Sequence, residues 1–124
     1  MTMQNINQKN VALVNLDFIK KNTGNNPGFL KEMVQLFIAN LPKDMNKLVE
    51  AKNNNDWQTV GAVAHKMKPN IDIIGVECLH ETIRNIEKNA RSESNLDEVA
   101  EEVSFMEEKV SQIQDELQEH LENL

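Results

Sequence analysis

Apolar residues recur at spacings of three and four along most of this chain, and this period constrains the fold more than any other feature. It is clearest near the C-terminal end, in a stripe of nine residues: Leu96, Val99, Val103, Met106, Val110, Ile113, Leu117, Leu121 and Leu124. A period near 3.6 residues puts such a stripe on one face of an α-helix, whereas a strand needs alternation of apolar and polar residues. No segment shows sustained alternation, so the sequence predicts an all-α fold.

A second stripe predicts a long helix that begins at Asn26 and Pro27, which are preferred types for an N-cap and a first helical residue. Its apolar members are Phe29, Met33, Leu36, Phe37, Leu41, Met45 and Leu48. Pro42 lies within this stripe and has no N–H to donate to the carbonyl group of Ile38. We therefore expect a kink, or a break into two helices, near Asn40.

Two further stripes predict the helices that lie between this helix and the last one. The first follows Asp56, a good N-cap, and contains Trp57, Val60, Ala64, Met67, Ile71 and Ile74. The second follows a turn at Gly75 and contains Leu79, Ile83, Ile86 and Ala90. Ser94 with Asp97 resembles a capping box at the start of the last helix.

The N-terminal part of the chain has a different character. Residues 1–15 are polar and rich in Asn and Gln, so we expect a flexible arm. Residues 16–22 suit a short helix with Leu16 and Ile19 inward. Because short connections imply antiparallel neighbours, residues 16–124 are predicted to form an up-and-down antiparallel four-helix bundle with a short extra N-terminal helix. The last stripe also suits a coiled coil between chains, so a monomer is favoured and a dimer stays possible.

Length and charge narrow the choice of partners and compartment. The 124 residues suit one domain, and the net charge of −7 is concentrated in residues 63–124, which carry fifteen acidic and six basic residues. Nucleic-acid binding is therefore not expected, since it needs clustered basic charge. The single Cys78, interpreted as buried, fits a reducing compartment. Without a signal peptide or an apolar stretch of membrane-spanning length, we expect a cytoplasmic protein with no membrane contact.

One histidine lies in a setting that suggests phosphoryl chemistry. In the stretch AHKMKPNIDIIG, His65 is flanked by Lys66 and Lys68, and the helical period places it on an open face beside the core stripe. Gly61, one turn earlier on that face, would allow another protein to approach closely. Pro69 removes the hydrogen bond to the His65 carbonyl group, and we expect a local kink that frees this face. By period alone, a solvated surface histidine is the commoner interpretation.

The order of these residues resembles the signature of histidine-containing phosphotransfer (HPt) domains. That signature is H-x-x-K-G-S with a glycine ten positions after the histidine, and His65, Lys68 and Gly75 occupy its corresponding positions. The sequence departs from it at Pro69 and Asn70, where the family usually has glycine and serine. The resemblance implies a four-helix bundle in which His65 becomes a phosphohistidine. It would accept a phosphoryl group from a receiver-domain aspartyl phosphate and pass it to another receiver aspartate.

The chemistry assigns roles to individual residues. A neutral imidazole at His65 can attack phosphorus from one ring nitrogen while a hydrogen bond holds the other, and Lys68 can stabilise the charge of the phosphoryl oxygens. Lys66 points away from that face, and is either an attractor for an acidic partner or an ordinary solvated lysine. No zinc-type spacing joins His65 to His80, and none involves His120.

Glu87 is the candidate for orienting His65. It lies twenty-two positions later, where an antiparallel helix returns past the histidine. In HPt proteins a Glu or Gln at this spacing can hydrogen-bond the second ring nitrogen, so the resemblance supports Glu87. An ion pair of Glu87 with Arg84 or Arg91 is the alternative.

Missing motifs limit the activity that the chain is expected to have. The sequence contains no P-loop or glycine-rich nucleotide motif, so an ATP-dependent kinase is not expected. The resemblance implies no cofactor of its own, with Mg²⁺ held by the partner. The expected partners are receiver domains of response regulators and of hybrid histidine kinases. The rival interpretation is a non-catalytic helical scaffold or inhibitor that binds receiver or kinase domains without phosphotransfer.

Overall fold

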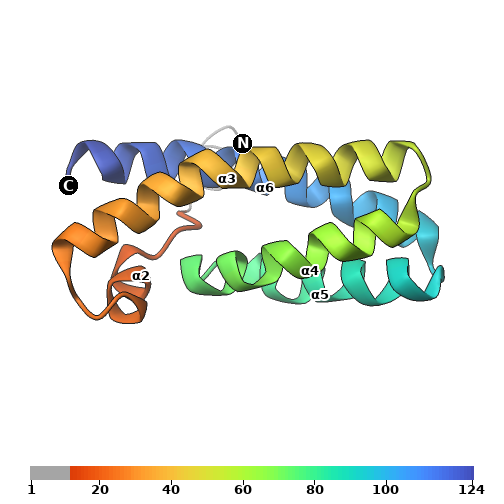
Figure 1. Cartoon of the computed structure of the whole chain (residues 1–124), viewed down its shortest axis with the longest axis horizontal. Helices are drawn as coiled ribbons and strands as arrows, with labels where there is room; N and C mark the ends of the chain where they lie inside the picture. Colours follow the sequence, from red (N-terminus) through yellow and green to blue (C-terminus); the bar gives the residue numbers. More distant parts are fainter. Residues whose placement is uncertain (1–11) are drawn as a thin grey trace, which may run out of the picture.

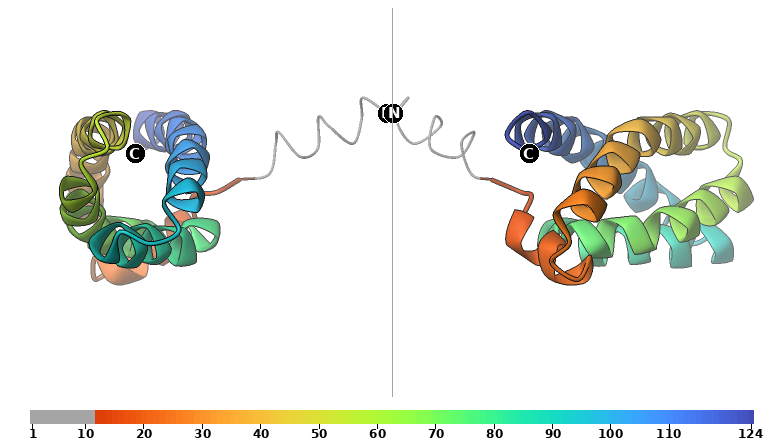
Figure 2. Two further views of the ribbon diagram at one scale, coloured as in Figure 1. Left: turned by 90° about the vertical axis from the view of Figure 1, so that its right-hand side faces the viewer. Right: turned by 60° about the vertical axis from the view of Figure 1, so that its left-hand side comes forward.

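The computed structural model describes residues 12–124, and these residues fold into helices joined by short turns. In chain order the helices are α2 (Leu16–Asn22), α3 (Pro27–Asn53), α4 (Trp57–Ile74), α5 (Glu77–Ser92) and α6 (Leu96–Glu122). The four long helices run alternately back and forth (Figure 1) and surround a common centre when seen from the end (Figure 2). The prediction of an all-α up-and-down bundle with a short additional helix is confirmed.

Local capping explains where several helices begin and end. The Asn26 side chain accepts the Phe29 amide at 3.1 Å before α3, and Asp56 accepts the Thr59 amide at 3.3 Å before α4. Gly75 ends α4 in the left-handed conformation, with φ of 77°, which glycine adopts most readily. These boundaries agree with the prediction from sequence.

The capping box predicted for the last helix is wrong. α6 begins after Asn95, which has a φ of 51° and makes no side-chain capping bond. The Ser94 hydroxyl lies instead 2.6 Å from the hydroxyl of Ser92 and 3.4 Å from Asn89 Oδ1. The serine therefore stabilises the turn after α5 and makes no cap for α6.

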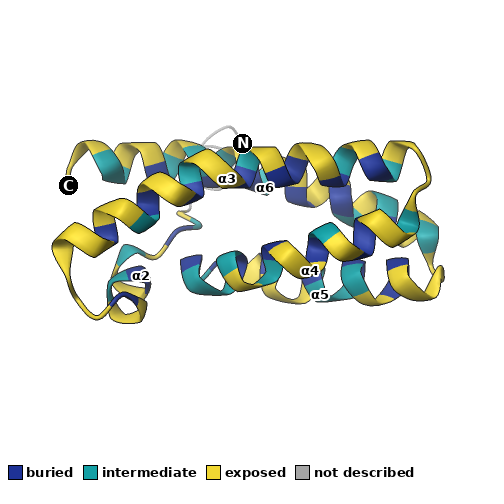
Figure 3. Ribbon diagram, viewed as in Figure 1, coloured by how far each residue is buried: buried dark blue, intermediate teal, exposed yellow. Residues whose placement is uncertain are grey.

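The core is formed by one face of each long helix, and Figure 3 shows the buried faces turned toward the centre of the bundle. The predicted stripes of α4, α5 and α6 account for most of their buried residues. In the first three turns of α3 the prediction was wrong in part: Leu30 and Val34 are buried, whereas Phe29 and Leu36 are exposed. This stretch carries two adjacent apolar stripes, and their spacing cannot show which one faces the core.

α3 continues through Pro42, which excludes the predicted alternative of a break into two helices. Figure 1 shows the helix bending near its middle. The carbonyl group of Ile38, which Pro42 leaves without its usual partner, accepts a hydrogen bond from Gln114 Nε2 of α6 at 3.0 Å. A neighbouring helix therefore satisfies the backbone group that the proline leaves open.

The described end of the predicted arm is anchored to the bundle. The amides of Leu13 and Val14 donate to the Glu116 carboxylate at 2.9 and 2.8 Å, and Val14 is buried. In α2, Ile19 is buried as predicted, and Leu16 packs against the core in part. Residues 1–11 of the predicted arm lie outside the described residues. Among the helices that the structure describes, none combines the length and apolar character needed to cross a membrane.

Candidate functional site

His65 lies on the outward face of α4, and its side chain is 61 % exposed. Its Nδ1 atom is 2.7 Å from Glu87 Oε2 on the neighbouring helix α5. Because α5 runs antiparallel to α4, it returns past His65 twenty-two residues later along the chain. The structure thus brings together the histidine and the carboxylate that the sequence placed on separate helices.

Glu87 also binds two cations. Lys68 Nζ lies 2.7 Å from its Oε1 atom, and Arg91 Nη2 lies 3.4 Å from Oε2. The hydrogen bond from Lys68 is the main reason why the pKa of Glu87 is lowered; the hydrogen bond with His65 acts in the same direction, and partial burial opposes both. Glu87 is therefore ionised at neutral pH and can only accept hydrogen bonds.

The ionised state of Glu87 bears on the tautomer of His65. A neutral imidazole that donates to Glu87 carries its proton on Nδ1 and has its lone pair on Nε2. Glu87 thus selects the tautomer with a nucleophilic nitrogen on the side of the ring away from α5. Both interpretations from the sequence apply to Glu87, because it contacts His65 and also pairs with Arg91. The roles of His65, Lys68 and Glu87 in phosphotransfer stay predictions.

Lys66 lies on the other side of α4, where its Nζ atom is 3.0 Å from Asp44 Oδ1 of α3. The Asp44 side chain is only 3 % exposed. The sequence reasoning missed Asp44, although a signal was present, since it falls between Leu41 and Leu48 in the apolar stripe of α3. Lys66 therefore pairs with a buried carboxylate while its own side chain is 64 % exposed, and its role toward a partner stays a prediction.

Gly61 has a different environment from the one that the sequence predicted. It is buried, and a Cβ atom built on it would lie 2.7 Å from Cγ of Arg91. The space above this glycine is therefore occupied by a side chain of α5, and the prediction that it opens the surface to another protein is wrong.

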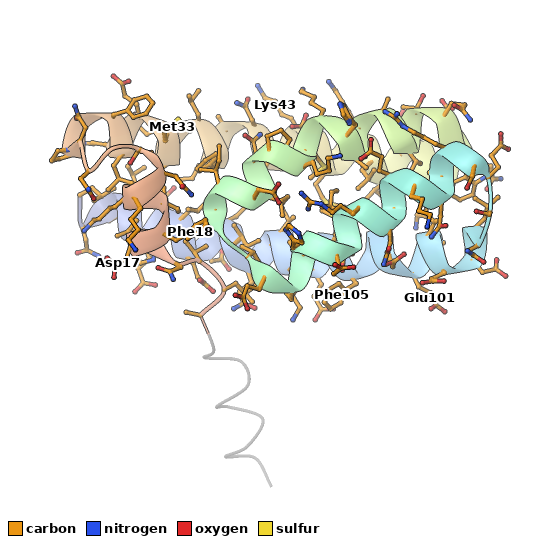
Figure 4. The ribbon with its side chains drawn as sticks, turned by 90° about the horizontal axis from the view of Figure 1, so that it is seen from below. Asp17, Phe18, Met33, Lys43, Glu101 and Phe105 are labelled. Atoms are coloured by element: carbon orange, nitrogen blue, oxygen red, sulfur yellow. The ribbon has the colours of Figure 1, made fainter. Side chains whose placement is uncertain are left out.

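Pro69 and Gly75 are the remaining predicted supporting residues. α4 is continuous through Pro69, and the adjacent His65 stays exposed. Gly75 lies at the far end of α4, where a Cβ atom would come within 2.6 Å of the Phe18 ring. Figure 4 shows Phe18 on α2, beside the end of the bundle where α4 and α5 meet. Gly75 thus acts on the turn between the helices and makes no contact with His65.

A second charged group links α4 to α5. Arg84 donates to both oxygens of Asp72, at 3.1 and 2.7 Å, and His80 Nδ1 lies 3.2 Å from Asp72 Oδ1. The hydrogen bond from Arg84 is the main cause of the lowered pKa of Asp72. Of the two predicted alternative partners of Glu87, Arg84 thus pairs with Asp72, and Arg91 remains at Glu87.

Cys78 is exposed, so its interpretation as a buried residue is wrong. It lies in the first turn of α5, directly before the buried Leu79. Within residues 12–124, His, Cys, Asp and Glu side chains form no group of three suited to holding a metal ion.

Comparisons with known proteins bear on the family and on the fold. The family model for the Hpt domain matches residues 32–124. The crystal structure of the HPT domain from an Hpt sensor hybrid histidine kinase of Shewanella is similar, with a TM-score of 0.81 and 18 % sequence identity. The similarity covers 90 % of this chain and 96 % of that domain, and at this identity it shows the fold alone. No curated protein shows significant sequence similarity to the chain.

Proposed function

This chain belongs to the Hpt domain family, and on that basis we propose that His65 is the phosphoryl carrier of a phosphorelay. The family implies histidine phosphotransfer in two-component signalling. The proposed reaction takes a phosphoryl group from the aspartyl phosphate of one receiver domain and passes it to the aspartate of another. The observation that carries the proposal is the 2.7 Å contact between His65 Nδ1 and Glu87 Oε2, which holds an imidazole that is itself exposed.

In the accepting step, His65 Nε2 attacks the phosphorus atom in line with the bond to the aspartate oxygen. The P–O bond breaks, the aspartate leaves as a carboxylate, and a P–N bond forms. The positive charge that develops on the imidazole is stabilised by the ionised Glu87, to which Nδ1 donates. The reverse sequence of bond changes, with a second aspartate as nucleophile, returns the imidazole to its starting state.

The phosphoryl oxygens bring negative charge to a site that already holds two cations. Lys68 and Arg91 both contact Glu87, and the Arg91 contact is on the oxygen that also binds His65. We propose that both cations turn from Glu87 toward the phosphoryl oxygens when His65 is phosphorylated. Glu87 would keep the imidazole oriented while its two other partners stabilise the transferred group.

The same proposal assigns the partner and its metal ion. A receiver domain would dock over His65. Two exposed apolar side chains of α3, Phe29 at 46 % and Leu36 at 52 %, would extend the docking surface along that helix. Figure 4 shows Met33 and Lys43 along the outer edge of this helix. The receiver would supply the Mg²⁺ ion for the reaction. We expect the relay to operate in the cytoplasm, as the free thiol at Cys78 also suggests.

The test is transfer of labelled phosphate from a panel of phosphorylated receiver domains to the purified protein, with His65→Gln as control. We expect an acid-labile, base-stable label on the wild-type protein and none on the variant. A second unlabelled receiver should then remove the label. If the folded wild-type protein binds a receiver but takes up no label, the non-catalytic scaffold is the better interpretation.

A further inference from the structure

The Arg91 side chain crosses from α5 to α4 over Gly61, one turn before His65. A Cβ atom at position 61 would lie 2.7 Å from Arg91 Cγ and 3.5 Å from Nε. The first distance is shorter than carbon atoms tolerate without bonding, since their optimal separation is about 3.5–4.0 Å. The aliphatic part of Arg91 therefore takes this path only because residue 61 has no side chain.

The path determines where the guanidinium group of Arg91 arrives. From Gly61 the side chain reaches Glu87, where Nη2 lies 3.4 Å from Oε2, the oxygen that also binds His65 Nδ1. Arg91 is only one turn after Glu87 on α5, so many of its rotamers would instead point to solvent. Contact with the surface of α4 at Gly61 restricts that choice.

We infer that Gly61 is a positioning residue for phosphotransfer, which acts by seating Arg91 beside the reactive imidazole. The inference rests on the proposed function of His65. Gly61 has no side chain that could contact the His65 ring or the phosphoryl group in this scheme, and its effect depends entirely on the side chain that lies over it. An alanine at this position would displace the Arg91 stem and move its guanidinium group away from Glu87 and from the phosphoryl oxygens.

The Arg91 side chain can take up the displacement by a change of rotamer that moves its Cγ atom. The Arg91 atom nearest to the added methyl group belongs to a flexible side chain that is 52 % exposed, and the Arg91 backbone nitrogen is at an ordinary 3.6 Å. Alanine also favours the helix more than glycine does. Gly61→Ala should thus preserve or raise the melting temperature while it slows transfer, a combination that a purely structural role does not give.

The experiment compares Gly61→Ala, Arg91→Ala and the double variant with the wild-type protein. It measures the rate of phosphoryl transfer from one receiver, the affinity of each protein for that receiver, and the melting temperature of each protein. We expect each single variant to slow transfer about tenfold, as the loss of one charge-assisted contact to the transferring group would. The double variant should be no slower than Arg91→Ala, and receiver affinity should stay unchanged.

Three results would overturn the inference: normal transfer in Gly61→Ala, loss of its fold, or a double variant slowed by the product of the two single effects. These results differ from failure of the proposed function itself. If no receiver labels the wild-type protein at His65, the phosphocarrier proposal fails. If the wild-type protein is labelled and Gly61→Ala matches its rate, only the role of Gly61 is refuted.

Discussion

At the scale of single residues, Glu87 contacts three different groups, because its two oxygens pair with an imidazole, an ammonium group and a guanidinium group. Glu87→Gln keeps an oxygen that can accept from His65 Nδ1, whereas Glu87→Ala removes it. We expect Glu87→Ala to slow transfer roughly 10- to 100-fold, the equivalent of one hydrogen bond to a charged group, and Glu87→Gln to retain more activity.

The nitrogen-15 chemical shifts of the imidazole ring check the cause of that loss. In the wild-type protein and in Glu87→Gln, the neutral ring should carry its proton on Nδ1, and in Glu87→Ala it should become a mixture of tautomers. An unchanged transfer rate together with unchanged shifts in Glu87→Ala would remove Glu87 from the site.

The pKa of Glu102 on α6 is shifted in the opposite direction from that of Glu87. Burial is the main reason why its pKa is raised above the ordinary 4.5. Asn85 Nδ2 is 3.4 Å from Oε2, and Oε1 is buried without a hydrogen-bond partner among residues 12–124. Because the pKa is higher in the folded state, ionisation of Glu102 lowers the free energy of unfolding as the pH rises above 4.5. Below pH 4.5 the carboxyl group is protonated in both states, and this loss of stability disappears.

Replacing Glu102 should therefore help stability in a pH-dependent way. We expect Glu102→Gln to raise the free energy of unfolding at pH 7, with a gain that shrinks as the pH approaches 4. Urea unfolding at several pH values measures this difference. A gain that is constant across pH would show that charge is not the cause.

At the scale of secondary-structure elements, α3 and α6 are joined where Pro42 interrupts the hydrogen bonding of α3. Gln114 supplies the missing donor to the Ile38 carbonyl group. We expect Gln114→Ala to destabilise the protein by about 1–3 kcal/mol, because it leaves a carbonyl group at a helix–helix interface without a partner. In a Pro42→Ala background the restored amide can take over, so the same substitution should cost clearly less there. Equal costs in both backgrounds, from denaturant unfolding, would contradict this compensation.

The same helix shows how far the sequence predicts the structure. Asn26, Asp56 and Gly75 mark helix boundaries through local chemistry, and these were correct. Whether Phe29 or Leu30 faces the core depends on which side α6 and α4 cover, and the spacing within α3 holds no such information.

The candidate site divides in the same way. His65, Lys68 and Glu87 were identified from a resemblance and from antiparallel pairing. The contact of Asp44 with Lys66 and that of Arg91 with Gly61 were not predicted. Both depend on the paths that long side chains take between helices, and no local sequence pattern indicates these paths.

At the scale of the whole molecule, the apolar stripe of α6 is enclosed by its own chain. The members of this stripe from Val99 to Leu117 are buried against the other helices, and Leu124, which follows the end of α6, is 42 % exposed. A coiled coil between two chains would need that stripe to be open. We therefore expect light scattering to give the mass of one chain at micromolar concentration. A concentration-dependent mass that approaches two chains would instead point to another face, such as the exposed edge of α3 at Phe29 and Leu36.

His65 and Glu87 lie within long helices and not on loops, and this position determines how a phosphorylated molecule would differ from an unphosphorylated one. A helical pair fixed along its length by ion pairs offers no segment to order or to release. The transferred group would then change the local charge and leave the outline of the bundle as it was. We would then expect the direction of phosphoryl transfer to depend on which receiver holds the phosphoryl group at lower free energy.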